Sequence, residues 1–183
     1  MSFGSIAAMA LLTIAILTLI VAVIHAGVLS IYKTEELLYE QMKIMDERLK
    51  TEIAIESIVF DPLDPSIVYV NVTNAGSSSI NIASFNKADV VVTYISTTNV
   101  KIIKRLKYDP SKTGLDIWYI NRVLVDDREG DIVNPIDLDS HHGLWDPGET
   151  LELTLKLSVA ADPTQGMSVV MALPNGVSTM LSV

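Results

Sequence analysis

The spacing of hydrophobic residues changes along the chain, and the first stretch is apolar almost without interruption. Met1–Tyr32 contains no Asp, Glu, Lys or Arg, and its apolar run Ile6–Ile24 is long enough to cross the roughly 30 Å hydrocarbon core of a bilayer as a helix. No basic residue precedes the run, which favours a retained transmembrane helix over a cleaved signal. No proline precedes Pro62 and no glycine interrupts residues 28–75, so we expect the helix to continue to about Glu56.

The second part of the predicted helix is amphipathic. Beyond Tyr32, apolar residues recur at steps of three, four or seven positions, and charged residues fill the other faces, as in a helix that packs on one side. We predict an N-terminal helical segment over residues 1–57, hydrophobic over 3–30 and amphipathic over 31–57. Its expected assembly contacts are Ile6, Leu11, Leu12, Ile16, Leu19, Val23, Leu38, Met42, Met45 and Leu49.

From about Ile58 the hydrophobic spacing changes to two. Glu149–Val159 is the clearest example, because its leucines and Val159 alternate with polar residues, as in an antiparallel strand with one dry and one wet face. Asn175-Gly176 separates the last two such runs and is a strong hairpin signal. The fold class is therefore predicted as α+β: the helix, then an antiparallel immunoglobulin-like β-sandwich over residues 58–183 that folds without it. Further strands are expected at 66–73, 89–95, 100–107, 117–125, 167–173 and 177–181.

Composition and motifs argue against several classes of function. The net charge of −9 gives poor electrostatic support for binding nucleic acid. The absence of cysteine excludes disulfides, thiolate metal sites and a cysteine nucleophile. The sequence contains no Gly-x-Ser-x-Gly, P-loop, Rossmann glycine run or His-Glu-x-x-His motif. We expect no catalytic site and no cofactor.

Charged residues concentrate in two places within the predicted sandwich. Asp126–Glu149 is rich in acidic residues, whose carboxylates are ligands that calcium prefers. Without EF-hand spacing, a solvated acidic loop is favoured over a calcium site. The weaker alternative would use Asp126, Asp127, Glu129 and Asp131. Positive charge gathers on one predicted strand, at Lys101, Lys104, Arg105 and Lys107. This strand either stays solvated or meets the acidic loop of a neighbouring subunit.

Asn71-Val72-Thr73 is a sequon for N-glycosylation. Because Val70 and Val72 are expected to point inward, Asn71 should point outward. Modification at Asn71 is therefore sterically feasible, although sequons also arise by chance.

Several segments together resemble one family. The uncharged helix that becomes amphipathic is followed by Val70–Ser77, Asp89–Tyr94, Trp145–Glu149 and Leu173–Val177. The combination resembles the archaeal flagellin superfamily, which comprises archaellins and the related archaellum F and G proteins with a type IV pilin-like N-terminal helix. Filament subunits of this class are made with a short basic leader, and none precedes Phe3 here. We expect either a mature chain or a member that lacks a leader.

The resemblance and the residue patterns lead to two main hypotheses. The first is a non-enzymatic structural subunit of an archaellum- or type IV pilus-like surface filament, with helices in the core, sandwiches outside, and the membrane as its location before assembly. The alternative is a stationary accessory protein in the cytoplasmic membrane, whose extracytoplasmic sandwich binds a motor or cell-envelope partner such as a surface-layer protein. A third, more distant hypothesis is a membrane-tethered adhesion or carbohydrate-binding domain.

Overall fold

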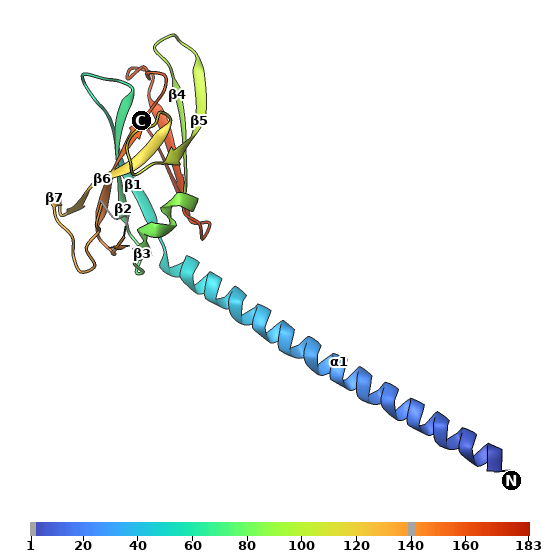
Figure 1. Cartoon of the computed structure of the whole chain (residues 1–183). Helices are drawn as coiled ribbons and strands as arrows, with labels where there is room; N and C mark the ends of the chain where they lie inside the picture. The colour runs from blue at the N-terminus through green and yellow to red at the C-terminus, as the bar shows by residue number, and fades with distance from the viewer. Residues whose placement is uncertain (1–2, 139–141) are drawn as a thin grey trace. The chain divides into compact units, whose positions relative to one another are not determined.

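The computed structural model describes residues 3–138 and 142–183, with side chains from residue 9 onward. The chain divides into two compact units, residues 1–45 and 46–183. A single helix, α1, covers Phe3–Lys50 and makes up the described part of the first unit (Figure 1). At 1.5 Å per residue it is about 70 Å long.

The helix ends at Lys50, earlier than the predicted boundary near residues 56 and 57. The carbonyl of Lys50 accepts hydrogen bonds from the N–H groups of Ser77 and Ser78 at 2.9 and 3.2 Å, which satisfies the helix end. A Cβ on Gly76 would lie 2.5 Å from the same carbonyl, so only glycine allows this close approach. Strand β1 (Ile53–Phe60) follows at once. The sheet domain therefore begins before residue 58.

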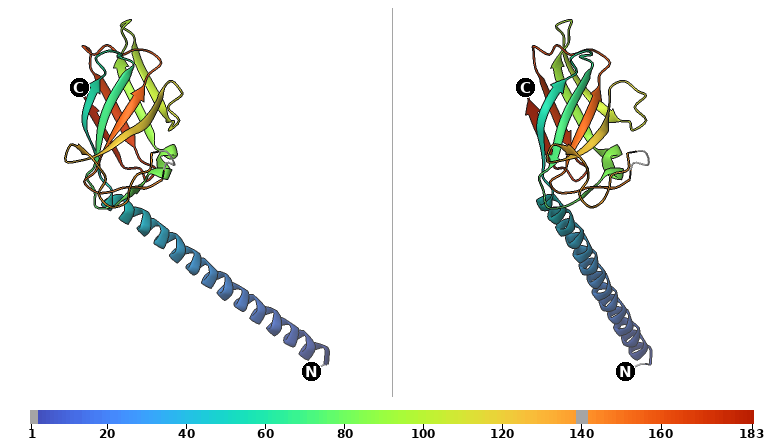
Figure 2. Two further views of the ribbon diagram at one scale, coloured as in Figure 1. Left: turned by 60° about the vertical axis from the view of Figure 1, so that its left-hand side comes forward. Right: turned by 90° about the vertical axis from the view of Figure 1, so that its left-hand side faces the viewer.

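The second unit is a β-sandwich, which confirms the predicted fold class (Figure 2). One sheet has the antiparallel order β1-β2-β9-β6, with the short β7 on the edge of β6, and the other has the order β5-β4-β10-β11. A short parallel pairing of β5 with β6 joins them. The remaining bounds are β2 Ile67–Asn74, β4 Asp89–Ile95, β5 Lys101–Tyr108, β6 Ile117–Val125, β7 Arg128–Glu129, β9 Thr150–Lys156, β10 Met167–Ala172 and β11 Ser178–Ser182. A small second pairing joins β3 (Ile80–Asn81) to β8 (Leu144–Trp145), and a 3-10 helix, η1, covers Ile82–Lys87.

The core lies between the two sheets and is built from the alternating residues that the sequence indicated. Val70 on β2 and Leu153 on β9 are in register and are both buried. An aromatic cluster closes one end, where the ring of Phe85 lies 5.7 Å from Trp118 and 6.1 Å from Trp145. Contacts of this geometry add to the stabilisation from burial alone.

The outer side of β9 differs from its prediction. Glu152 and Thr154 were expected on a wet face, yet they are only 8% and 3% exposed. β9 is a central strand, and side chains from β2 and β6 cover it on both sides. Val159, which was expected to point inward, lies beyond the end of β9 and is 36% exposed.

Candidate assembly helix and the charged clusters of the sandwich

The described part of α1 carries large apolar side chains on its surface, and they are exposed. From residue 9 to Lys50 every helical residue is exposed. Leu19 and Met42, for example, are 67% and 70% exposed. The expected assembly residues that the structure describes are all in this state: Leu11, Leu12, Ile16, Leu19, Val23, Leu38, Met42, Met45 and Leu49. The backbone of Ile6 belongs to α1, but its side chain lies outside the described part.

Few polar groups interrupt the apolar half of α1, and the hydroxyls of its two threonines are satisfied within the helix. Thr13 donates to the carbonyl of Met9 at 2.8 Å, and Thr18 donates to that of Ile14 at 2.9 Å. These bonds satisfy the two threonine hydroxyls without water, which suits an apolar environment. Within the described chain, α1 is the one helix long and apolar enough to cross a membrane.

Buried carboxylates tie together the loops at one end of the sandwich. Glu149 is fully buried, and its carboxylate accepts hydrogen bonds from the N–H groups of Ile132 and Asp146 at 2.6 and 2.8 Å. Asp146 accepts from the hydroxyl of Ser79 at 2.5 Å and from the N–H of Asn134 at 3.0 Å. The arrangement therefore connects the loop after β2, residues 131–136 and the turn before β9.

The two carboxyl groups at the centre of this arrangement differ in proton affinity. Burial, the largest influence, raises the pKa of Glu149, and a hydrogen bond with Asp131 acts in the same direction. The buried Oδ1 of Asp131 has no other donor among the described residues. A proton on Glu149 would satisfy that oxygen. Burial also opposes ionisation of Asp146, but hydrogen bonds from Ser79 and Asn134 lower its pKa overall.

Replacing Glu149 with Gln should change the pH dependence of stability. Because the folded pKa lies above the unfolded value of 4.5, the stabilisation from Glu149 is fully present below that value and is lost as the pH rises through the folded pKa. The difference in unfolding free energy between wild-type and Glu149→Gln domains should therefore shrink from pH 4 to pH 8. Urea unfolding at both pH values measures it, with the exposed Glu129→Gln as control. An unchanged difference would exclude a protonated Glu149.

The weakly predicted calcium residues are not brought together. Asp126 and Asp127 form the turn between β6 and β7, with positive φ angles of 48° and 62°, and Glu129 lies exposed on β7. Only Asp131 joins a group of converging carboxylates, and its partners there are Asp146 and Glu149, with ligand atoms within 4.8 Å of one another. These three are the described residues that could offer oxygen ligands to a hard cation. Hydrogen bonds from N–H groups already occupy the oxygens of Asp146 and Glu149.

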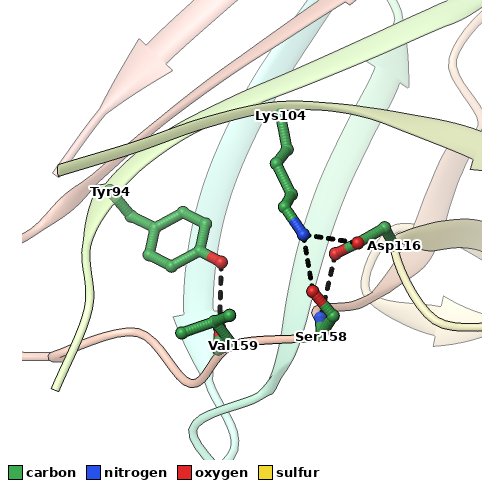
Figure 3. Close-up of polar contacts among 5 residues, drawn as sticks. All are labelled: Tyr94, Lys104, Asp116, Ser158 and Val159. Atoms are coloured by element: carbon green, nitrogen blue, oxygen red, sulfur yellow. Dashed lines mark hydrogen bonds and ion pairs between the residues drawn. The ribbon is translucent and has the colours of Figure 1, made fainter. Parts of the chain in front are cut away.

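The basic residues of β5 divide into an inward-turned and an outward-turned group. Figure 3 shows the amine of Lys104 between Asp116 and Ser158, to which it donates hydrogen bonds of 2.5 Å each. Asp116 also accepts from the N–H of Ser158 at 2.9 Å. Burial opposes ionisation of Asp116, but these hydrogen bonds lower its pKa overall. Lys104 thus holds the chain after β9 in place and is not available to a partner, unlike Lys101, Arg105 and Lys107, which are exposed.

Substitution of Lys104 should cost more stability than substitution of its neighbour Arg105. The side chains of Lys104 and Asp116 are 31% and 29% exposed, whereas those of Arg105 and its partner Asp89 are 70% and 45% exposed. We expect Lys104→Ala to lower the unfolding free energy by about 1–2 kcal/mol and Arg105→Ala by about 0–1 kcal/mol. Chemical denaturation of the two variants would compare them, and equal losses would contradict the assigned difference.

The sequon residue Asn71 lies on the outer side of β2 and is half-buried. It is paired with Ser57 on β1 and Glu152 on β9, so it belongs to the middle of a sheet. Thr73 of the sequon is also engaged, since its hydroxyl lies 2.7 Å from that of Thr150. Asn71 lies on the outer side of the sheet as expected, and its glycosylation stays a prediction.

One structural centre could not be recognised from sequence. Trp145–Glu149 entered the sequence analysis only as part of the family resemblance, yet Glu149 accepts buried hydrogen bonds, and the fully buried Asn74 donates to the carbonyl of Trp145 at 2.9 Å. The only available signal was an acidic residue at the start of a strongly alternating strand. Its partners come from distant segments, so spacing alone did not reveal them.

A long helix whose described apolar side chains are exposed, joined to a sandwich whose buried polar groups hold loops together, is typical of a protein that assembles or is anchored. The archaeal-type flagellin family matches residues 2–183, and the chain belongs to this family. Members of this family are structural filament proteins rather than enzymes. No curated protein has a significantly similar sequence.

Similar solved structures include proteins of the archaellum. The archaeal flagellum of Methanospirillum hungatei strain JF1 matches 99% of this chain and 92% of its own, with a TM-score of 0.53 and 11% identity. The periplasmic stator complex FlaF and FlaG from Sulfolobus acidocaldarius matches 73% of this chain and 89% of its own, with a TM-score of 0.50 and 13% identity. FlaG alone from that organism matches 73% of this chain and 99% of its own, with a TM-score of 0.48 and 13% identity. At such identities the likeness concerns the fold alone.

Proposed function

We propose that this chain is the repeating subunit of an archaellum-like surface filament, with α1 helices packed together in the core and sandwiches forming the outer layer. The observation that carries the proposal is the complete exposure of α1 from residue 9 to Lys50 in a member of the archaeal-type flagellin family. The part of α1 before Lys33 is apolar on all sides, and a helix of this kind requires burial. The sandwich already covers its own core, so the helix must be covered by other molecules.

Two environments would bury the helix in succession. Before assembly, the apolar half of α1 fits a lipid bilayer, because its length and satisfied hydroxyls match that solvent. After assembly, other copies of α1 replace the lipid. Small residues such as Ala15, Ala22 and Gly27 allow neighbouring helices to approach closely.

Immunogold labelling of native cells would test this proposal. Antibody against residues 46–183 should decorate sheared surface filaments along their whole length, and mass spectrometry should find this chain as a major filament component. Label confined to the membrane, with filaments left bare, would contradict the proposal and favour the stationary accessory protein. Co-purification from the membrane would then test for a motor or surface-layer partner.

A further inference from the structure

We propose that the outer face of the β5-β4-β10-β11 sheet binds the acidic β6–β7 hairpin region of a second copy of this chain, and that this contact repeats along the assembly. The proposal rests on the proposed function, since it assigns a contact between neighbouring subunits. The first surface, called the basic sheet face, consists of the outward residues of the four strands. The second, called the acidic hairpin, consists of residues 126–133.

The basic sheet face combines an apolar centre with a positive border. One row of paired residues crosses the four strands. It runs from Met180 on β11 through Val170 on β10 and Val91 on β4 to Arg105 on β5. Ile103 on the next row is 66% exposed and Met180 is 65% exposed. The charged members are Lys101, Arg105 and Lys107, with Asp89 as the acidic exception beside Arg105. This face is thus locally positive on a chain whose net charge is −9.

The acidic hairpin has the complementary composition. Asp126, Asp127 and Glu129 are exposed at its tip, and Arg128 is its only basic residue. Immediately after them, Ile132 and Val133 are 49% and 70% exposed. The hairpin therefore offers carboxylates and apolar side chains together, matching the border and the centre of the basic sheet face. Opposite charges across an interface set its register and exclude other partners.

Within one molecule the two surfaces belong to different sheets, because β7 pairs with β6 and the basic sheet face lies on β5, β4, β10 and β11. Figure 1 shows β7 on the other side of the sandwich from β4 and β5. A second copy must therefore supply the hairpin, and the contact joins two different patches. A contact of this heterologous kind leaves a free hairpin and a free sheet face at the two ends, so it can propagate through a filament.

The outer face of the other sheet lacks this combination. Tyr69, Asn71 and Thr154 lie along it, and Arg122 is neutralised by Glu152 at 2.7 Å. Some of its polar side chains have partners nearby, as when Asn121 donates to Glu152 at 2.6 Å. A cleft of about 300 Å³ lined in part by Arg105 and Lys107 instead adjoins the basic sheet face.

Site-directed crosslinking tests the contact. Because the chain contains no cysteine, only the introduced thiols can react with the crosslinker. Thr93→Cys places a thiol on the basic sheet face, and Arg128→Cys places one in the hairpin, while every proposed cation and acid is kept. Filaments of the double variant treated with a bismaleimide should give a ladder of covalent dimers, trimers and higher oligomers. Each single variant should stay monomeric, as should Thr93→Cys/Asn121→Cys, which moves the second thiol to the exposed Asn121 of the other sheet.

Charge-reversal variants provide a second test of the same contact. Adding Lys101→Glu and Lys107→Glu to the double-cysteine variant should lower the ladder yield severalfold, and Glu129→Lys on that background should restore part of it. Intact filaments without a ladder, or with dimers from Thr93→Cys alone, would overturn the contact and leave the proposed function standing. Failure of the unmodified chain to enter filaments would overturn both.

Discussion

Residues 46–183 should fold as a soluble, all-β domain, whereas residues 57–183 should not be stable. The fragment of residues 57–183 lacks the first half of β1, including the buried Ile53 and Ile55. Loss of each buried side chain of this size costs about 2–5 kcal/mol, which is comparable with the whole stability of a small domain. The hydrogen bonds that the carbonyls of Lys50 and Glu52 accept from the N–H groups of residues 76–78 would be lost as well.

Circular dichroism and urea unfolding of the two fragments provide the measurement. Two point variants of residues 46–183 separate the lost side chains from the shortened backbone. Ile55→Ala should lower the unfolding free energy by about 2–4 kcal/mol, and the neighbouring exposed Glu56→Ala should change it by less than about 0.5 kcal/mol. Equal stability of the two fragments would mean that β1 is an attachment and not part of the core.

A single charge in the apolar half of α1 should abolish assembly. Leu19 is 67% exposed in the isolated chain, yet it must be buried in lipid or among helices if the proposed function holds. An aspartate at the centre of a membrane helix costs about 3 kcal/mol relative to water, in addition to the lost contribution of leucine. Because every copy in a filament carries the change, the cost repeats at each subunit.

The matched control is Leu63→Asp, which makes the same substitution at a loop residue that is 94% exposed. Electron microscopy of sheared filaments and fractionation of the cells would compare the two variants. Leu19→Asp should leave no filaments, while Leu63→Asp should leave their number unchanged. Normal filaments from Leu19→Asp would show that this part of the helix stays outside the core.

Alternation located most of the strands because each strand has one side in the core. Residues 89–95 and 117–125 were predicted as strands with the bounds that β4 and β6 have. The helix end was misplaced because no local breaker marks it. Lys50 is capped by Ser77 and Ser78, residues brought there by the turn after β2. Such a cap becomes visible only when the sheet has formed.

The charged clusters were only partly predictable for the same reason. The sequence grouped Asp131 with Asp126, Asp127 and Glu129 because they are neighbours along the chain. In the structure Asp131 turns to Glu149, which is held by N–H groups from separate loops. Lys104 and Arg105 are likewise adjacent in sequence, but strand alternation sends Lys104 to Asp116 and Arg105 to the surface.

A cryo-electron microscopy map of the native filament would test the central claim most directly. The account predicts a core of closely packed helices into which residues 3–50 fit as one continuous helix, surrounded by sandwiches built from residues 53–183. A filament whose core is formed by another protein, with this chain left in the membrane, would contradict it.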